Sequence, residues 1–389
     1  MTTTSTPTLL RGGRIVTSTG VLDDGWLTVR DDAIEQVGTG LPEHDHSHDP
    51  DAPVLDLAGA WVLPGFVDMH CHGGGGAAYT ENDPERLATA VAAHRRHGTT
   101  TTMASLVSGP IPALVEQISS LRELVSDGLF AGIHLEGPFI SAARCGAHDP
   151  AFLRAPDRSS VDALLAAGQG TIRMVTLAPE LDGAIDAVRR FTDAGVIVAV
   201  GHTDATLAQV LPAVDAGATV ATHLFNGMRP LHHREPGPIG ALLDDERVTV
   251  ELICDLVHLH PTVVRMAARH AGAGRTVLVT DAMAAAGVGD GVYQVGGLRV
   301  TVRDGVPTLD GGGALAASTL TLDAAVRNFV QGCGMTMVEA AAAVSGQPAA
   351  LLGQQGSIGA VAPGARADLV LLDEGLHTTG VMHRGAWVA

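Results

Sequence analysis

After Pro64 the chain alternates between short apolar runs and longer stretches in which apolar residues recur every three or four positions. The short runs are rich in Val, Ile and Thr, which predicts buried strands, and the periodic stretches predict amphipathic helices. Strands are expected over residues 66–70, 99–106, 132–136, 172–178, 196–201, 220–223, 248–254 and 277–280. Helices are expected between them, over residues 83–97, 111–127, 159–167, 182–194, 205–216 and 262–271.

This alternation predicts an α/β protein whose main part is a (β/α)8 barrel. We assign residues 63–355 to the barrel, including a hairpin insertion near residues 292–310. The insertion is indicated by turn signals at residues 296–297 and 304–305. In such a barrel the active site is expected at the C-terminal ends of the strands.

Short strands without intervening helices are expected at both ends of the chain, in residues 1–62 and 356–389. We expect the two segments to form one small β-sandwich domain. The first segment contains a His-rich tract at residues 44–48, which we interpret as a solvated loop rather than a second metal site.

The composition is that of a globular enzyme, with 46% hydrophobic and 17% charged residues in a chain of 389. No apolar run reaches the roughly 18 residues of a membrane span, and no basic-then-apolar leader is present. The net charge of −18 argues against a nucleic acid or an anionic membrane as partner. The four cysteines are scattered without a CxxC pair, which predicts free thiols in a reducing cytoplasm.

Lysine is absent, because all 24 basic residues are arginine. Every mechanism that needs a lysine amine or a carboxylated lysine is therefore excluded, including Schiff bases, Walker phosphate loops and lysine-bridged metal pairs. An anionic substrate would have to be held by a local cluster of cations, since the overall field of the chain is repulsive.

The first barrel strand ends in His70-Cys71-His72, and four glycines follow. Side chains alternate between the faces of a strand, so the two histidines point to one side, about 6–7 Å apart, and Cys71 points to the other. This geometry suits a metal ion at the strand end, and the glycine run leaves the approach open.

Four more metal-capable residues stand where other predicted strands end: Glu136, His202, His223 and Asp281. Each alone has an ordinary explanation, such as a salt bridge, a helix cap or a turn. Because the C-terminal ends of barrel strands share one face, all six residues are expected to lie together. Six metal-capable side chains at the ends of five strands predict a metal site.

These features resemble the amidohydrolase superfamily, whose Pro-Gly-Phe-x-Asp-x-His-x-His signature stands at residues 64–72. Over nearly the whole chain the sequence is similar to the N-acetylglucosamine-6-phosphate deacetylases. The specific segments are HLEGPF at 134–139, GAH at 146–148, THLFNGM at 222–228, REPG at 234–237, LAASTLT at 315–321 and PGARADLV at 363–370. A glutamate from the third strand, in place of the carboxylated lysine of many relatives, agrees with the absence of lysine.

The resemblance implies one or two divalent ions per chain. Glu136, His202 and His223 would hold the main ion. His70 and His72 would hold a second, with Asp281 close to both ions and Glu136 able to bridge them. Some family members lack the histidine pair and work with one ion. Zinc is the expected metal, with iron, manganese, cobalt and cadmium as alternatives.

The implied reaction removes the acetyl group of N-acetylglucosamine 6-phosphate, a step of amino-sugar catabolism and cell-wall recycling. Metal coordination would lower the pKa of the attacking water. Asp281 would take a proton from this water and return it to the departing amine. His148 would stabilise the charge that develops on the carbonyl oxygen.

The family's substrate contacts match Ala147, His148, Asn226, Gly227, Arg234, His258 and Ala317. An arginine can hold a phosphate with two parallel hydrogen bonds. In relatives the arginine that matches Arg234 reaches in from the neighbouring subunit, which implies a homodimer. Without the resemblance, Arg234 would be read as a solvated loop charge.

Three other functions stay open. A deacetylase for the galacto epimer is the nearest, a nucleobase deaminase is disfavoured by the HLFN and REPG segments, and a catalytically silent interaction protein is expected to have lost ligands. The family commonly has glycine where Leu256 stands and alanine where Gly227 stands, so the sugar is less fixed than the reaction. Cys145, in the loop 141–148, is interpreted as an inert thiol, with a redox or gating role as the alternative.

Overall fold

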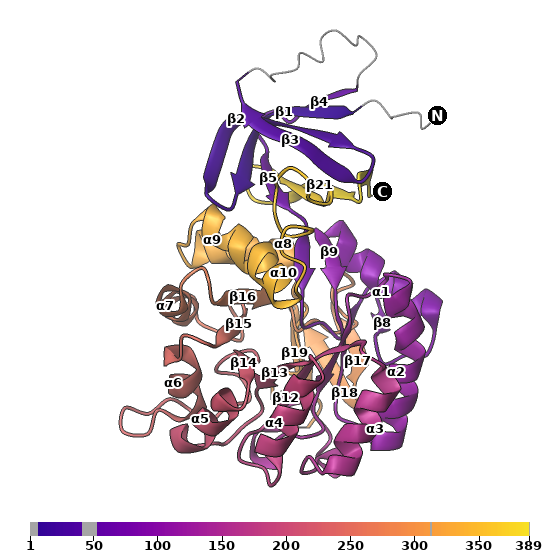
Figure 1. Ribbon diagram of the computed structural model, residues 1–389, viewed down its shortest axis with the longest axis vertical. Helices are drawn as coiled ribbons and strands as arrows, with labels where there is room; N and C mark the ends of the chain where they lie inside the picture. Colours follow the sequence, from indigo (N-terminus) through magenta and orange to yellow (C-terminus); the bar gives the residue numbers. More distant parts are fainter. Residues whose placement is uncertain (1–6, 41–52, 312, 389) are drawn as a thin grey trace. The chain divides into compact units, whose positions relative to one another are not determined.

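The computed structural model describes residues 7–40, 53–311 and 313–388 (Figure 1). The His-rich tract at 44–48 lies outside the described residues, so its interpretation stays a prediction. The chain divides into two compact units. The larger consists of residues 68–94 and 102–321, and the smaller combines the two chain ends with residues 95–101.

A parallel sheet forms the centre of the larger unit, with its strands in sequence order. Each neighbouring pair is parallel. The strands are mostly apolar, because nearly all of their side chains are buried on both faces of the sheet. They are β10 (Ala104–Leu106), β11 (Ile133–Glu136), β12 (Ile172–Leu177), β13 (Ile197–Val200), β14 (Ala218–Ala221), β15 (Thr249–Ile253) and β16 (Thr276–Val279).

The first barrel strand closes this sheet. It consists of β6 (Phe66–Asp68), which pairs with β9 (Thr99–Thr102), and of the extended residues after it. On one side the backbone N–H of Met103 donates to the Asp68 carbonyl at 2.9 Å. On the other side the backbone N–H of Asp281 donates to the His70 carbonyl at 2.8 Å. The predicted (β/α)8 barrel is thereby confirmed.

Helices lie around the outside of the strands, as Figure 1 shows for α2 to α7. They are α1 (Pro84–Arg96), α2 (Ile111–Ser126), α3 (Arg158–Gly168), α4 (Ala184–Asp193), α5 (Leu207–Asp215), α6 (Gly237–Asp244) and α7 (Pro261–Ala271). In α4 the buried residues Ala184, Ala187, Val188 and Phe191 follow the helical period that predicted it. α6 was not predicted from the sequence, because this short helix is apolar nearly all round and shows no amphipathic period.

The hairpin insertion is present as an antiparallel sheet of β17 (Gly291–Val295), β18 (Leu298–Arg303) and β19 (Val306–Leu309). Its turns fall at residues 296–297 and 304–305, as predicted. Short elements complete the larger unit: β7 (Gly73–Gly74), β8 (Ala77–Ala78) and the 3-10 turns Ala142–Arg144 and Pro150–Phe152. Of the described helices, none has the length and apolar character needed to cross a membrane.

Both chain ends form one hydrogen-bonded sheet, which confirms the predicted small β domain. The sheet order is β22-β21-β20-β5-β1-β2-β3, with β4 paired to β1. The ends meet where β20 runs antiparallel to β5. The strands are β1 (Thr8–Thr17), β2 (Gly20–Arg30), β3 (Ala33–Thr39), β4 (Val54–Asp56), β5 (Trp61–Pro64), β20 (Leu369–Leu372), β21 (Thr378–His383) and β22 (Ala386–Trp387).

Three short helices belong to the same unit: α8 (Leu322–Arg327), α9 (Met337–Ala341) and α10 (Gln347–Leu351). A π-helical turn follows α8, and another joins α9 to α10. Thr336 caps α9, since its hydroxyl accepts from the backbone N–H of Glu339 at 3.2 Å while the Glu339 carboxylate accepts from the backbone N–H of Thr336 at 2.7 Å.

Removal of one hydroxyl group that joins the first and last barrel strands is expected to lower the stability of the protein. Thr280 Oγ1 donates to the buried carboxylate of Asp68 at 2.6 Å and so joins the first and last strands. Thr280→Val should cost about 1–3 kcal/mol, because it leaves a buried acceptor without its donor. Thermal unfolding of the metal-stripped protein measures this. The control is Thr28→Val, since the buried Thr28 hydroxyl has no hydrogen-bond partner among the described residues. Equal losses in both variants would contradict the explanation.

Candidate active site

The six predicted metal ligands come together at the C-terminal ends of the barrel strands. All are buried, with at most 7% of any of these residues exposed. His70 and His72 follow β6, Glu136 ends β11, His202 and His223 lie two residues beyond β13 and β14, and Asp281 lies two residues beyond β16.

Glu136 lies between two groups of donor atoms. Its Oε1 is 3.0 Å from Nε2 of both His202 and His223. Its Oε2 is 3.1 Å from Nε2 of His72 and 3.5 Å from Nε2 of His70. Each carboxylate oxygen therefore faces one group, which is the arrangement that a bridge between two ions requires.

Asp281 completes the second group. Its Oδ1 is 3.2 Å from Nε2 of His72 and 3.5 Å from Nε2 of His70. Burial works to raise the pKa of Asp281, but the adjacent His70 and His72 outweigh it and lower that pKa to about 2. The carboxylate is therefore ionised near neutral pH and able to accept a proton.

Hydrogen bonds on the far side of the rings fix how the histidines face the centre. Nδ1 of His72 is 3.2 Å from the carbonyl of Ser105, and Nδ1 of His202 is 2.8 Å from the carbonyl of Arg144. A nitrogen that faces a carbonyl must carry the proton, so the Nε2 atom of each ring points its lone pair inward. These histidines are therefore in the tautomer that binds a metal.

Histidine nitrogens whose lone pairs point at one another over a short distance need a cation between them. The Nε2 atoms of His70 and His72 are 3.2 Å apart, and those of His202 and His223 are 3.1 Å apart. Without a metal ion, protons must supply the positive charge. Burial lowers the pKa of His72, but the neighbouring carboxylates outweigh it and raise that pKa to about 9. A donor set of imidazoles and carboxylates fits a divalent ion such as zinc.

The backbone is strained at three of these residues. φ is 46° at His202, 28° at His223 and 48° at Asp281, in the left-handed region that non-glycine residues avoid. The cost is of order 1–2 kcal/mol per residue. Such conformations persist where the surroundings fix them, and they are typical of functional sites.

His148 lies at the same centre in the opposite tautomer. Its Nδ1 accepts from the backbone N–H of Ser108 at 3.1 Å, so its Nε2 must carry the proton. This Nε2 lies 3.4 Å from Oε2 of Glu136. Burial lowers the pKa of His148 and keeps the ring neutral. His148 is therefore suited to donate a hydrogen bond into the site rather than to bind a metal.

The model of the amidohydrolase family matches residues 61–388, which include every residue of the site described above. The chain belongs to the amidohydrolase family. Members of this family typically bind a divalent metal, in agreement with the donor set found here.

Individual relatives of this amidohydrolase are sugar-phosphate deacetylases. The N-acetylgalactosamine-6-phosphate deacetylase of Escherichia coli O157:H7 is 38% identical over 97% of this chain and 98% of that protein. The N-acetylglucosamine-6-phosphate deacetylase of Bacillus subtilis is 34% identical over 97% and 96%. A solved variant of the Mycobacterium smegmatis N-acetyl-D-glucosamine-6-phosphate deacetylase, in complex with N-acetyl-D-glucosamine-6-phosphate, is 45% identical, covers 99% of this chain and 100% of that one, and superposes with a TM-score of 0.94.

A cavity of about 240 Å³ opens onto the centre of this amidohydrolase. Most of the expected substrate contacts line it: Ala147, His148, Asn226, Gly227, His258 and Ala317. His258 is held in place by Asp255, whose Oδ2 lies 2.6 Å from its Nδ1. Neither Leu256 nor Cys145 is among the lining residues.

Arg234 does not line the cavity of its own chain. It lies on an exposed loop between β14 and α6, and its Nη1 donates to Nε2 of His233 at 2.9 Å. The structure of one chain therefore separates Arg234 from the other expected substrate contacts.

Glu251, which was not among the residues predicted from the sequence, lies in the middle of β15 and is 1% exposed. Its Oε2 faces Nδ1 of His70 at 3.3 Å and accepts from the backbone N–H of His223 at 3.2 Å. It thus contacts one residue from each donor group. The signal was a charged residue inside the apolar run Val-Glu-Leu-Ile, because buried carboxylates are rare unless they are paired.

Asp68, Cys71 and His94 form a second group of metal-capable side chains, with ligand atoms within 4.8 Å of one another. Nε2 of His94 faces the carbonyl of Gly73 at 2.8 Å and must carry a proton, so its lone pair does not point at Cys71. Asp68 is already hydrogen-bonded by Thr280. We therefore assign this group a structural role, with Cys71 pointing away from the histidine pair as predicted.

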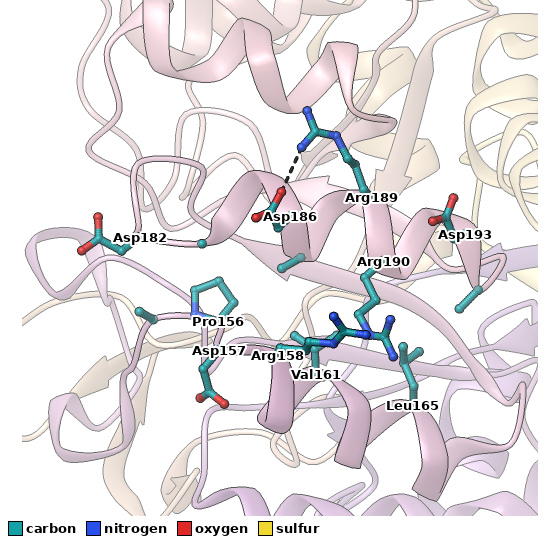
Figure 2. Close-up of a pocket in the computed structure, with 14 residues that line it drawn as sticks. Pro156, Asp157, Arg158, Val161, Leu165, Asp182, Asp186, Arg189, Arg190 and Asp193 are labelled. Carbon is teal, nitrogen blue, oxygen red and sulfur yellow. Dashed lines mark hydrogen bonds and ion pairs between the residues drawn. The ribbon is translucent and has the colours of Figure 1, made fainter.

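A larger hollow of about 840 Å³ lies between α3 and α4 (Figure 2). Its charges are mostly paired: Arg189 contacts Asp186 at 2.9 Å, and Arg190 pairs with Asp162. Its lining contains no histidine or cysteine, so the chemistry of the metal site does not extend to it.

Metal binding should release protons. Below pH 9 the stripped protein holds a proton at His72, whose pKa is raised to about 9, and a metal ion would need that lone pair. Calorimetric titration with Zn²⁺ at pH 7.5, in two buffers of different ionisation enthalpy, should show release of at least about one proton per chain. The release should shrink above pH 9. An enthalpy independent of the buffer would show that the His72 ring is already neutral in the stripped protein and would contradict its raised pKa.

Proposed function

We propose that this chain is a metal-dependent deacetylase that converts N-acetylglucosamine 6-phosphate and water into glucosamine 6-phosphate and acetate. The observation that carries the proposal is the arrangement around Glu136. Two donor groups face its two oxygens, with the ionised Asp281 in one of them and the N–H of His148 beside them. The relatives act on N-acetylated hexosamine 6-phosphates, as their names state.

Glu136, His202 and His223 would hold the main ion, and His70, His72 and Asp281 a second one bridged by Glu136. A bound divalent ion would supply Lewis-acid chemistry, polarising the acetamide carbonyl and lowering the pKa of the attacking water. We propose zinc for this role, because imidazole and carboxylate ligands suit it, with iron, manganese, cobalt and cadmium as alternatives.

The residues of the chain move the protons. Asp281 accepts a proton from the attacking water while the oxygen of that water forms the new bond to the carbonyl carbon. The same proton passes to the amine nitrogen as the C–N bond breaks, because an amine leaves poorly as an anion. The Nε2–H of His148 donates to the carbonyl oxygen while charge develops on it.

Among the described residues that line it, the cavity of one chain has no arginine to hold the phosphate end of the substrate. Asn226, Gly227 and His258 line the cavity, and Arg234 does not. We propose a homodimer in which Arg234 of a second copy reaches this end and holds the phosphate with two hydrogen bonds. A cytoplasmic location is part of the same proposal, since the four cysteines are scattered along the sequence without a CxxC pair.

The galacto epimer is the second candidate substrate, because the Escherichia coli O157:H7 relative is named for it. The loop of Leu256 is a place where specificity can differ. Leu256 has φ of 65°, a conformation that suits the glycine common in the family. An interaction-only function has no comparable support, since the six metal-capable side chains are all present and brought together.

Acetate release should be fast from N-acetylglucosamine 6-phosphate and much slower from unphosphorylated N-acetylglucosamine. The rate of acetate release from the galacto epimer, measured in parallel on the same sample, decides which of the two phosphosugars is the better substrate. The metal content of that sample is assayed as well. Asp281→Asn is the matched variant: it keeps Glu136, His202 and His223 and should keep metal, but lose about 10²–10⁴-fold in kcat. Metal-loaded protein that releases no acetate from any of the three sugars would refute the proposal, and an active Asp281→Asn variant would refute the role of Asp281.

Arg234→Ala should lower kcat/KM for the phosphorylated substrate about 10- to 150-fold, which corresponds to one charged hydrogen-bonded contact of about 1.5–3 kcal/mol. The unphosphorylated sugar should be nearly unaffected. Co-expressed Arg234→Ala and Asp281→Asn chains then test the dimer. If Arg234 acts on the neighbouring chain, each mixed dimer holds one intact site and activity returns. Absence of rescue would place Arg234 in its own chain's site or outside it.

A further inference from the structure

The hairpin insertion β17–β19 has no role in the reaction described above, yet it reaches the catalytic cavity. Val295, the last residue of β17, is 6% exposed and lines the same cavity as the metal-capable residues. The turn after it lies close against Val107, since a Cβ atom on Gly296 would be 2.8 Å from Cγ2 of Val107. Val295 and Val107 belong to one buried cluster, against which Ala147 packs.

Two of these apolar residues are sequence neighbours of Ser108 and His148, the pair that presents an N–H donor to the site. Val107 directly precedes Ser108, whose backbone N–H fixes the tautomer of His148. Ala147 directly precedes His148 itself. Val107, Ala147 and Val295 all line the cavity. The sequence neighbours of Ser108 and His148 therefore contribute an apolar surface beside the Nε2–H of His148, which is proposed to face the carbonyl oxygen.

The substrate offers one small group to such a surface. Its ring hydroxyls and phosphate need polar partners, and burial against aliphatic side chains would leave them without hydrogen bonds. The acetyl methyl group has no polar atom. It is bonded to the same carbon as the carbonyl oxygen that His148 faces, and it must therefore lie close to this surface when the carbonyl is in place.

We propose that Val107, Ala147 and Val295 form an acyl wall that holds the acetyl methyl group and restricts this enzyme to acetylated amino-sugar phosphates. The inference rests on the proposed deacetylase function and adds a specificity device to it. A longer acyl chain would have to displace Val295 or Val107, which are buried and locked by their packing. One methylene in a close-fitting apolar pocket changes kcat/KM by about 10- to 200-fold.

The test compares N-acetyl-, N-propanoyl- and N-butanoylglucosamine 6-phosphate with the metal-loaded protein. Val295→Ala should raise the propanoyl-to-acetyl ratio of kcat/KM about tenfold or more, because it opens room for the added methylene. Val107→Ala, from a different element, should move the ratio in the same direction.

Val300→Ala is the matched control. Val300 is fully buried in the same hairpin and the same cluster, loses the same atoms, and does not line the cavity. Its ratio should stay within about twofold of the parent protein, whatever happens to thermal stability.

An unchanged ratio in both Val295→Ala and Val107→Ala would overturn the acyl wall and assign the apolar surface to the C–H face of the sugar ring. An equal shift in Val300→Ala would also overturn it, because the effect would then be general loosening of the hairpin. So would a parent protein that hydrolyses propanoyl and acetyl substrates equally well. If the metal-loaded parent protein hydrolyses none of these substrates, the result refutes the proposed function itself and not only the acyl wall.

Discussion

The shared carboxylate of Glu136 is the interaction on which the rest of the site depends. A buried charge costs several kcal/mol unless it is compensated. Here Oε1 faces imidazole nitrogens from the fifth and sixth strands, and Oε2 faces those of the first strand. Those nitrogens lie too close together to remain without a cation. The site therefore forms only if the first, third, fifth, sixth and last strands end on one face, which is what closure of the barrel provides.

The role of each histidine is set by the hydrogen bond that its Nδ1 atom makes on the side away from the centre. His72 and His202 point an inward lone pair because Nδ1 of each faces a backbone carbonyl. His148, at the same centre, presents an N–H because its Nδ1 accepts from the backbone N–H of Ser108. The same residue type is thus suited either to bind a metal or to donate a hydrogen bond, and a partner outside the centre decides which.

Strands and loops divide the work. The strand ends supply a rigid donor set suited to any metal-dependent hydrolysis, and loops supply what selects a substrate. The loop 141–148 brings His148, the loop between β14 and α6 carries Arg234 outward, and the hairpin insertion lines the cavity with Val295. This division explains how relatives can share a set of strand-end residues while they are named for different sugars.

The sequence by itself determined the barrel, the small β domain, the hairpin and the six residues at the strand ends, because each depends on local periodicity. Alternation along one strand placed His70 and His72 on one side and Cys71 on the other. Tertiary structure alone decided the tautomer of His148 and the contacts of Glu251, because their partners lie on other strands or loops, far away in the sequence. It also decided that Arg234 is remote from its own cavity, because the direction of a loop depends on packing that no local pattern records.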